Sequence, residues 1–390
     1  MKKKILLIAG EKSGDLLGSK IIEQLDKNIF EISVAGGSLM EEKSGQKSLF
    51  PIADTSVMGF FEILPRLFKI MKIIEKIAKF AVETSQDAIL TIDSPDFCFR
   101  IAKKIRKLAG KNRIKIFHLV APSVWFYRAG RAKKIAKIYN GLFCILPFEP
   151  PYFEKYGLKT IFVGHPIFEK KPSEDTSRGD ENTGLLAHRT GKTILLTPGS
   201  RIGEVNRILP LMVEVTKNLR KKYNFHYSVF TTEDTTAPVK KYLEARNIDY
   251  IDVVAEQEEK ENILEKTLLA LAKSGTNTLE IAAHAVPLVI VYKFNFLTNI
   301  LASLLLKIKS GKIYVNLVNI LAGREIIPEL ILRRCTIKNI EKSAIELIED
   351  EKSRDRQVEN NLEILKNLGY KANSSPSQVI ADEIRKSLEL

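Results

Sequence analysis

The chain has 390 residues, which is enough to bury a large core and is typical of two domains. Its three cysteines are odd in number and far apart, which excludes a disulfide framework and a zinc-finger pattern. The net charge of +14 indicates an anionic partner, such as a phosphorylated substrate, a membrane surface or nucleic acid, unless the lysines are simply spread over solvated faces. The apolar run that follows the first lysines is too short for a signal peptide.

Short apolar runs alternate with helical patterns in both halves of the chain, and each run is typical of a buried strand. In the first half the predicted strands are Ile5–Ile8, Ala88–Ile92, Ile114–Val120, Leu142–Leu146 and Thr160–Val163. In the second half they are Thr193–Thr197, His226–Phe230, Ile251–Val254, Leu268–Ala272 and Leu288–Val291. The alternation predicts an α/β fold of two Rossmann-like, doubly wound domains that face each other across a cleft.

A change in composition divides the two series of strands. The polar, charged stretch from Phe168 to Lys192 is typical of a connection between domains. The sequence therefore predicts an N-terminal domain over 1–168, a linker over 169–192 and a C-terminal domain over 193–350. A helical segment over 351–390 follows, and its packing back on the N-terminal domain is one arrangement that the sequence leaves open.

The stretch AGEKSGDLLG, from Ala9 to Gly18, follows the first predicted strand and opens a helix. Its glycines at four-residue spacing indicate a tight loop, and the helix N-terminus offers N–H groups to a ligand. The order of residues matches neither a Walker A loop, nor G-x-G-x-x-G, nor the G-x-S-x-G elbow of hydrolases. A ligand-binding loop and an ordinary first turn of a Rossmann-type domain therefore both remain open.

Two carboxylates follow the strand Ala88–Ile92 in the segment TIDSPDF. Asp93 stands at the carboxyl end of the strand, where ligands of doubly wound sheets bind, and a carboxylate there is placed to act as a general base. A cap on the next helix is the other role for a carboxylate here, and it suits Asp96 better than Asp93.

The segment PGSRIGEV places Ser200 and Arg201 at the start of a helix in the second half. An arginine there is unfavourable for the helix dipole, unless it reaches an anion that the same N-terminus binds. A diphosphate is such an anion, and a surface salt bridge is the alternative.

A second loop, SGTNTLE, supplies N–H and hydroxyl donors from Ser274, Gly275 and Thr276 at another helix start. Glu280 follows one turn later, where a carboxylate can accept from the two hydroxyls of a ribose or can merely favour the helix dipole.

The five histidines have no metal-ligand spacing and the chain has no D-x-D. These absences favour a metal-free site, in which arginine and helix dipoles take the charge of the leaving group.

Two stretches combine apolar and basic residues. The segment Met58–Phe80 has an apolar face and a lysine-rich face, which suits an interfacial helix or a wall for acyl chains. An ordinary helix that faces the core, with solvated lysines outside, is the reading that the pattern alone favours. The segment Phe294–Leu306 is too short to span a bilayer, and it either dips into a membrane surface or forms a buried helix.

Taken together, these motifs resemble the lipid-A-disaccharide synthase family. The matching segments are Ala9–Gly18, Asp93–Phe97, Pro122–Arg128 (PSVWFYR), Leu146–Glu149 (LPFE), Gly164–Pro166 (GHP), Pro198–Glu204, Ser274–Glu280 and Asn319–Glu325 (NILAGRE). They run in the family's order over most of the chain, and the ordered set is specific although each motif alone is weak. Thr197, Lys273 and Val318 depart from the usual family residues.

The resemblance implies a GT-B glycosyltransferase that transfers 2,3-diacylglucosamine from UDP-2,3-diacylglucosamine to 2,3-diacylglucosamine 1-phosphate, with inversion at the anomeric carbon. It implies no cofactor, and it implies a cytoplasmic enzyme bound peripherally to an anionic inner-membrane surface. Both substrates are anionic and acylated, which fits the positive charge. A homodimer is left open.

The resemblance also distributes roles among residues. Asp93 is expected to deprotonate the acceptor hydroxyl. Residues expected to bind the donor are Ser200, Arg201, Ser274, Gly275, Thr276, Glu280, Asn319 and Arg324, the last two by resemblance only. Residues expected on the acceptor side are Glu11, Ser13, Asp15, Met58 and Trp125.

Two other functions are weighed against this one. Another GT-B enzyme, either a UDP-sugar transferase with a different acceptor or a UDP-N-acetylglucosamine epimerase, would keep the second-half loops but would not explain AGEKSGD together with PSVW. A nucleic-acid-binding protein would interleave basic residues with exposed aromatics, whereas here they follow helix faces. We therefore expect no nucleic-acid partner.

Overall fold

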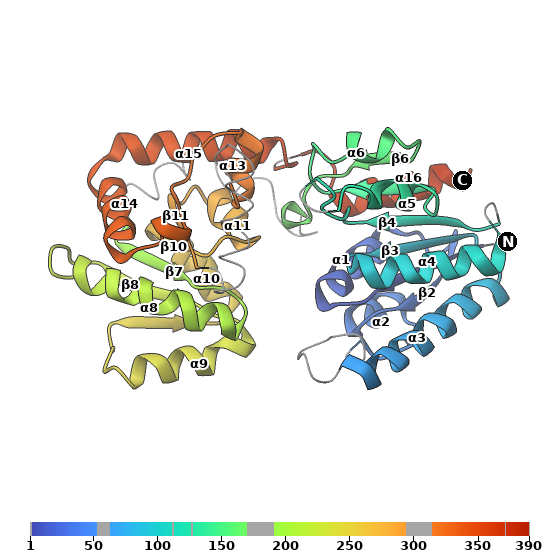
Figure 1. The fold of residues 1–390 in the computed structure, drawn as a ribbon, viewed down its shortest axis with the longest axis horizontal. Coiled ribbons are helices and arrows are strands. Elements are labelled where there is room, and N and C mark those ends of the chain that lie inside the picture. Colours follow the sequence, from blue (N-terminus) through green and yellow to red (C-terminus); the bar gives the residue numbers. More distant parts are fainter. Residues whose placement is uncertain are drawn as a thin grey trace. The chain divides into compact units, whose positions relative to one another are not determined.

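A computed structural model describes residues 2–52, 63–110, 113–125, 128–169, 191–293, 314–370 and 372–389. The chain divides into two lobes, one formed by Met1–Lys171 with Leu368–Leu390 and the other by Pro172–Asn367. Each lobe holds a six-stranded sheet with helices on both faces (Figure 1). Most of the predicted linker and the whole of Phe294–Leu306 lie outside the described residues.

The sheet of the first lobe has the order β2-β1-β3-β4-β5-β6, and all its described pairings are parallel. Its strands are β1 (Lys3–Ala9), β2 (Phe30–Ala35), β3 (Ala88–Ile92), β4 (Lys115–Leu119), β5 (Gly141–Cys144) and β6 (Lys159–Phe162). Its helices are α1 (Lys12–Gln24), α2 (Ser38–Ser44), α3 (Ile63–Glu83), α4 (Pro95–Ala109), α5 (Arg131–Ala136), α6 (Pro151–Glu154), the 3-10 turn η3 (Pro166–Phe168) and α16 (Pro376–Ser387).

Alternating side chains of β1 show how both faces of this sheet are buried. Leu6 and Ile8 pack into a cluster with residues of α3, α4 and α5. Ile5 and Leu7 point the other way, into a cluster with residues of α1, α2 and α16. A strand that is covered on both faces needs a continuous apolar run, which is why Ile5–Ile8 was readable as a strand.

The C-terminal helix α16 belongs to the first lobe, although the chain reaches it only after the second (Figure 1). It packs against α1, and Ile380 and Ile384 are buried in the same cluster as Ile22. Lys159 of β6 also forms an ion pair with Glu383 at 2.8 Å. The last residues of the chain are therefore part of the core that supports the first sheet.

The sheet of the second lobe has the order β12-β11-β10-β7-β8-β9, again with parallel pairings. Its strands are β7 (Thr193–Thr197), β8 (His226–Phe230), β9 (Ile251–Val254), β10 (Thr267–Ala272), β11 (Leu288–Tyr292) and β12 (Glu329–Ile331). Its helices are α8 (Ile202–Leu219), α9 (Glu233–Glu244), α10 (Gln257–Leu264), α11 (Asn277–Ala283), α13 (Leu317–Ala322), the 3-10 turn η4 (Leu332–Arg334), α14 (Ile337–Glu349) and α15 (Glu351–Lys366).

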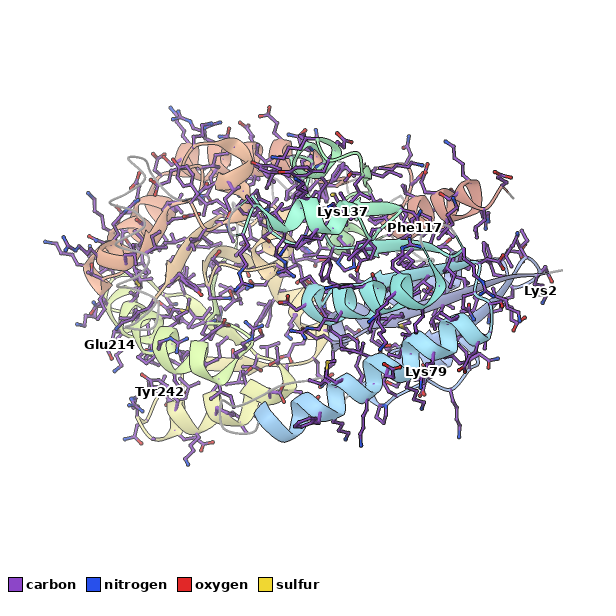
Figure 2. All side chains as sticks on the ribbon, turned by 45° about the vertical axis from the view of Figure 1, so that its right-hand side comes forward. Lys2, Lys79, Phe117, Lys137, Glu214 and Tyr242 are labelled. Carbon is purple, nitrogen blue, oxygen red and sulfur yellow. The ribbon has the colours of Figure 1, made fainter. Side chains whose placement is uncertain are left out.

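The helix α3 contains the described part of the basic amphipathic segment. Ile74, Ile77 and Ala78 are buried in the core, as the core-facing reading requires. Nearer the start of the helix, however, the side chains of Phe68 and Met71 are 71% and 48% exposed. Lysines such as Lys79 lie on the outer side of the helix (Figure 2). Met58 lies outside the described residues, and no described helix is long and apolar enough to cross a membrane.

Candidate functional site

The residue after β3 is held in an unusual backbone conformation. Asp93 and Ser94 have φ angles of +53° and +40°, and Val120, which follows the neighbouring strand β4, has +72°. Left-handed backbone is costly for residues other than glycine, and such strain gathers at functional sites. The backbone N–H of Asp93 donates to the carbonyl of Leu119 at 3.0 Å, so the two strand ends hold one another.

The partly exposed carboxylate of Asp93 has two donors within the first lobe. Oδ2 accepts from the hydroxyl of Ser13 at 2.7 Å, and Oδ1 accepts from the backbone N–H of Ser94 at 2.8 Å. Asp96 is different, because its exposed carboxylate forms an ion pair with Arg131 at 2.7 Å. Among the two candidates for a base, Asp93 is thus the one at the strand end, and Asp96 lies in the first turn of α4.

The loop after β1 is packed tightly beside Asp93. A Cβ added to Gly10 would lie 2.9 Å from a ring carbon of Phe97, and one added to Gly14 would lie 3.1 Å from the carbonyl oxygen of Ile92. Both positions therefore leave little room for a side chain, because the loop lies directly on the β3–α4 segment. Glu11 is the exposed N-cap residue of α1, at the mouth of this loop.

Asp15 has a structural role in the same loop region. Its carboxylate is buried, with 5% of the residue exposed, and it accepts hydrogen bonds from the backbone N–H groups of Gly37, Leu39 and Met40. These groups belong to the start of α2, whose N–H donors need an acceptor. Asp15 therefore fixes α2 against α1, and its charge is used within the protein.

The motifs after β4 and β5 come together through Trp125 and Glu149. The Trp125 ring packs edge-on against Phe148, with ring centroids 5.2 Å apart. Burial raises the pKa of the Glu149 carboxyl to about 7, although hydrogen bonds from the backbone N–H of Leu146 and from the Trp125 side chain oppose this shift. Glu149 is only 2% exposed, whereas Trp125 is partly exposed. The buried carboxyl therefore supports the position of the Trp125 ring.

Burial lowers the pKa of His118 to about 4, so this histidine is neutral at physiological pH. Its Nδ1 lies 2.8 Å from the hydroxyl of Thr91, and its ring stacks on Tyr139.

The described residues contain no group of three or more His, Cys, Asp or Glu side chains that could hold a metal ion.

The second lobe has a pocket of about 440 Å³ at the carboxyl ends of its strands, here named the Arg201 pocket. Its lining residues are Thr197, Gly199, Ser200, Arg201, Phe230, Thr231, Thr232, Gln257, Lys260, Leu264, Lys273, Gly275, Thr276, Asn277, Glu280 and Ile281. Loops after β7, β8 and β10 thus contribute to one pocket, as doubly wound folds require of a ligand site.

The loop after β7 brings a guanidinium to this pocket. Arg201 is the N-cap of α8, and its side chain is 80% exposed. One of its Nη atoms lies 3.6 Å from a carboxylate oxygen of Glu204, and the ammonium of Lys273 lies 3.1 Å from the same oxygen. Ser200, beside Arg201, is exposed. The N-terminus of α8 and two cations therefore meet at one place, which suits an anionic ligand.

The loop after β10 lies on the other side of the pocket. The hydroxyl of Ser274 donates to the carbonyl of Val315 at 3.0 Å, which orders the loop, while Gly275 and Thr276 line the pocket itself. Glu280 also lines it. Lys260 donates to the carbonyl of Thr231 at 2.7 Å, and burial lowers the pKa of its ammonium, an effect that the Glu280 carboxylate opposes.

Two residues expected on the donor side lie elsewhere. Asn319 is fully buried, donates to the carbonyl of Ile327 and accepts from the N–H groups of Ile326 and Ile327. Arg324 donates to Oδ1 of Asn360 at 2.7 Å. Neither is among the described residues that line the Arg201 pocket. The observed bonds of Asn319 hold the loop after α13, and a donor role for both residues stays a prediction by resemblance.

Sequence reasoning did not single out several of the lining residues. Thr231 and Thr232 follow β8, Gln257 and Lys260 lie on α10, and Asn277 begins α11, where its side chain donates to Thr197 at 3.0 Å. The two threonines could have been predicted as pocket residues, because they directly follow a correctly predicted strand. Lys260 could not, since its place in the pocket depends on how α10 packs.

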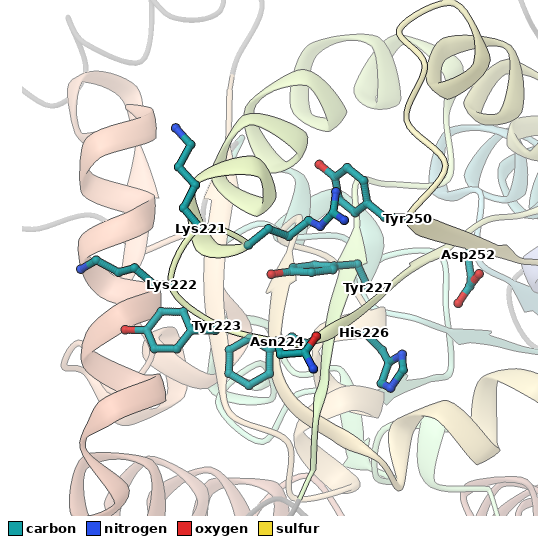
Figure 3. Close-up of a pocket in the computed structure, with 10 residues that line it drawn as sticks. Lys221, Lys222, Tyr223, Asn224, His226, Tyr227, Tyr250 and Asp252 are labelled. Carbon is teal, nitrogen blue, oxygen red and sulfur yellow. The ribbon is translucent and has the colours of Figure 1, made fainter.

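A second concavity of about 590 Å³ lies around the opposite end of β8 (Figure 3). Tyr227, His226 and Tyr250 line it together with residues 220–225 and Asp252. The guanidinium of Arg220 lies over the Tyr250 ring, 3.9 Å from its centroid. This concavity is at the amino ends of the strands, away from the loops that form ligand sites in such sheets.

Comparison with known proteins identifies the relatives of the chain. The family model described as lipid-A-disaccharide synthetase matches residues 5–383. A lipid-A-disaccharide synthase from Rickettsia prowazekii (strain Madrid E) is 41% identical over 392 residues, covering 98% of this chain and 99% of its own length. The enzyme of the same name from Rickettsia bellii (strain OSU 85-389) is 41% identical, with 98% of both chains covered.

Solved structures show the same fold at low sequence identity. An S. aureus MnaA–UDP co-structure has a TM-score of 0.65 at 13% identity and covers 100% of this chain and 98% of its own. The crystal structure of Acinetobacter baumannii MurG has a TM-score of 0.60 at 14% identity, covering 98% and 99%. These likenesses confirm the predicted GT-B fold class, and at such identity they bear on fold alone.

Proposed function

The chain belongs to the lipid-A-disaccharide synthetase family, and we propose that it transfers 2,3-diacylglucosamine from UDP-2,3-diacylglucosamine to 2,3-diacylglucosamine 1-phosphate. The products are a β-1′,6-linked tetraacyl disaccharide 1-phosphate and UDP. The observation that carries this proposal is the match over residues 5–383 together with relatives at 41% identity over nearly their full length. An epimerase-type reaction has no comparable support, because the solved epimerase of Neisseria meningitidis shares only 15% identity.

The acceptor side of the proposed reaction is in the first lobe. Asp93 takes the proton of the acceptor 6-hydroxyl while that oxygen bonds to the anomeric carbon of the donor. The hydrogen bonds from Ser13 and Ser94 orient the carboxylate, which supports this role. Glu11 at the N-cap of α1 and Trp125 after β4 are further acceptor-side candidates, and the buried Asp15 supports the loop that carries Ser13.

The donor side of the proposed reaction is the Arg201 pocket. As the bond from the anomeric carbon to the diphosphate oxygen breaks, its electron pair stays on UDP. Arg201 and the donors of Ser200 and residues 274–276 stabilise that charge, and Glu280 accepts from the ribose hydroxyls. The volume of about 440 Å³ and the cations that line the pocket support a nucleoside diphosphate as its occupant. Attack and departure on opposite faces of the carbon give inversion.

Both proposed substrates carry acyl chains, so the enzyme must meet a lipid surface. We propose that the exposed Phe68 and Met71 on α3, with the neighbouring lysines, contact an anionic membrane surface from the cytoplasmic side. The supporting observation is that these two apolar residues are exposed, whereas Ile74, Ile77 and Ala78 in the next two turns of the same helix are buried.

The experiment that tests this function is release of UDP by the purified protein, measured with chelator present. With UDP-2,3-diacylglucosamine alone, release should stay at background, and 2,3-diacylglucosamine 1-phosphate should start it. An unacylated glucosamine 1-phosphate serves as the matched control acceptor. Release without any acceptor, equal release with the unacylated acceptor, or conversion of UDP-N-acetylglucosamine to its epimer would contradict the proposal.

A further inference from the structure

The carboxylate of Glu204 lies beneath the Arg201 pocket in an unusual environment. Glu204 is in the first turn of α8 and only 7% exposed. Its Oε1 lies 3.1 Å from the ammonium of Lys273 and 3.6 Å from an Nη atom of Arg201. Its Oε2 is buried and has no hydrogen-bond partner among the residues that the structure describes. A buried carboxylate with one unsatisfied oxygen depends strongly on the cation that faces it.

The two cations near Glu204 differ in how they are placed. The side chain of Lys273 is 16% exposed, whereas that of Arg201 is 80% exposed. Lys273 is therefore the partner that neutralises the buried charge, and Arg201 keeps its guanidinium at the open side of the pocket. Without Lys273, the same carboxylate would have Arg201 as its nearest cation, and the guanidinium would be drawn down onto it.

Glycines of both loops lie close to Glu204 and Lys273. Gly199 has a φ of +122°, and a Cβ built on it would lie 2.5 Å from Oε2 of Glu204. On the other side, a Cβ built on Gly275 would lie 3.6 Å from the ammonium of Lys273. The backbone N–H of Lys273 also donates to the carbonyl of Thr197 at 2.9 Å. Lys273 thus joins the loop after β7 to the loop after β10, the two loops that face the anion.

We propose that Lys273 is a positioning residue for the donor diphosphate: it neutralises Glu204, and this leaves the guanidinium of Arg201 available to the phosphate oxygens. The inference rests on the proposed function in so far as the ligand of the pocket is a UDP-sugar. Lys273 acts through Glu204 and Arg201, so its effect depends on the charge at position 204. That dependence separates the proposal from a merely structural lysine.

The test is calorimetric titration of UDP into the full-length protein and its variants. Lys273→Met should raise the Kd for UDP about tenfold, the scale of one lost charge–charge interaction. The affinity for uridine, which has no phosphates and is measured by competition with UDP, should be the same in Lys273→Met as in wild type. Adding Glu204→Gln to Lys273→Met should return the Kd for UDP to within about threefold of wild type, because a neutral amide does not hold Arg201. Lys273→Arg should keep UDP affinity.

The matched control is Lys217 on α8, whose ammonium pairs with Glu214 at 2.8 Å on the exposed side of that helix. Lys217→Met, alone or with Glu214→Gln, should leave both affinities unchanged. If Lys273→Met does not fold, Lys273→Arg and the double variant, in which both charges are removed together, still give the comparison with wild type.

Three results would overturn the inference. One is a Lys273→Met protein that binds UDP as tightly as wild type, and another is a loss of affinity that Glu204→Gln does not restore. If the single variant does not fold, weak UDP binding by the double variant would also overturn the inference. If wild type itself does not bind UDP, the proposed function fails and the inference fails with it, whereas the other results count against the inference alone.

Discussion

The hydroxyl of Ser13 donates a 2.7 Å hydrogen bond to Oδ2 of Asp93. Ser13 lies in the first turn of α1 and Asp93 follows β3, so the bond joins the loops after two adjacent strands of one sheet. Together with the N–H of Ser94 on Oδ1, it fixes the direction of the carboxylate. A base that must meet one acceptor hydroxyl gains from being held before the substrate arrives.

Ser13→Ala removes this bond without touching the carboxylate. A hydrogen bond to a charged group is worth about 2 kcal/mol, so we expect kcat for transfer to fall about tenfold or more. Steady-state assays at saturating concentrations of both substrates measure kcat. Ser19→Ala is the control, because that hydroxyl on the same helix donates to the carbonyl of Leu16 at 2.8 Å and should be neutral for kcat. Equal rates for wild type and Ser13→Ala would show that the bond does not orient the base.

Asp15→Ala tests the structural role of the neighbouring carboxylate. Three N–H groups at the start of α2 lose their charged acceptor, and we expect the free energy of unfolding to fall by about 3 kcal/mol. Urea unfolding followed by circular dichroism gives the value. A loss below about 0.5 kcal/mol, the usual range for surface substitutions, together with abolished activity would instead assign Asp15 to the substrate.

Glu280→Gln tests the proposed contact with the ribose. In wild type, replacing UDP by 2′-deoxy-UDP should cost about tenfold in affinity, because a carboxylate that accepts from a hydroxyl is left without it. In Glu280→Gln the two nucleotides should bind more nearly alike. A discrimination that is the same in both proteins would mean that Glu280 serves only the start of α11.

Glu149→Gln tests the buried carboxyl under Trp125. Burial raises the pKa of Glu149 to about 7, above its value of about 4.5 in the unfolded chain, so the folded state binds the proton more tightly. The wild type therefore loses stability as the pH rises from about 4.5 to about 7, by about 3 kcal/mol at most. The glutamine variant lacks this loss. Urea unfolding should show the variant gaining on wild type between pH 5 and pH 8, and parallel curves would contradict the assignment.

The predicted strands in the middle of each sheet, such as β3 and β7, are buried along their whole length. β3, β7, β8 and β9 have the predicted bounds, and the other predicted strands differ by one or two residues at one or both ends. The two strands that were not predicted, β2 and β12, each lie at one edge of a sheet, whereas β6 and β9 at the opposite edges were predicted. In β2 the exposed Glu31 interrupts the apolar run, and β12 has only three residues, beginning with the buried Glu329. Edge strands need not be continuously apolar, so the pattern is weak there.

The site was predictable where a residue directly follows a strand and less so where it depends on packing between elements. The positions of Asp93 after a strand and of Arg201 at the start of a helix were predicted, because strand ends and helix starts can be recognised in the sequence. The contact of Asp15 with the start of α2 could not be predicted, because nothing local distinguishes an aspartate that caps another helix from one that faces a ligand. The bonds of Asn319 to the backbone after α13 likewise had no signal in the sequence. The link between Lys273 and Glu204 joins residues 69 positions apart and has no sequence signal.

The most direct test of the account is the comparison of wild type with Asp93→Asn, which keeps the size of the side chain and removes its basicity. Transfer to 2,3-diacylglucosamine 1-phosphate is measured with chelator present, and UDP binding is measured on the same preparations. The account predicts that transfer falls by about a hundredfold or more while the Kd for UDP is unchanged, since the Arg201 pocket belongs to the other lobe. Transfer by Asp93→Asn at the wild-type rate would contradict the account and would move the base to another residue.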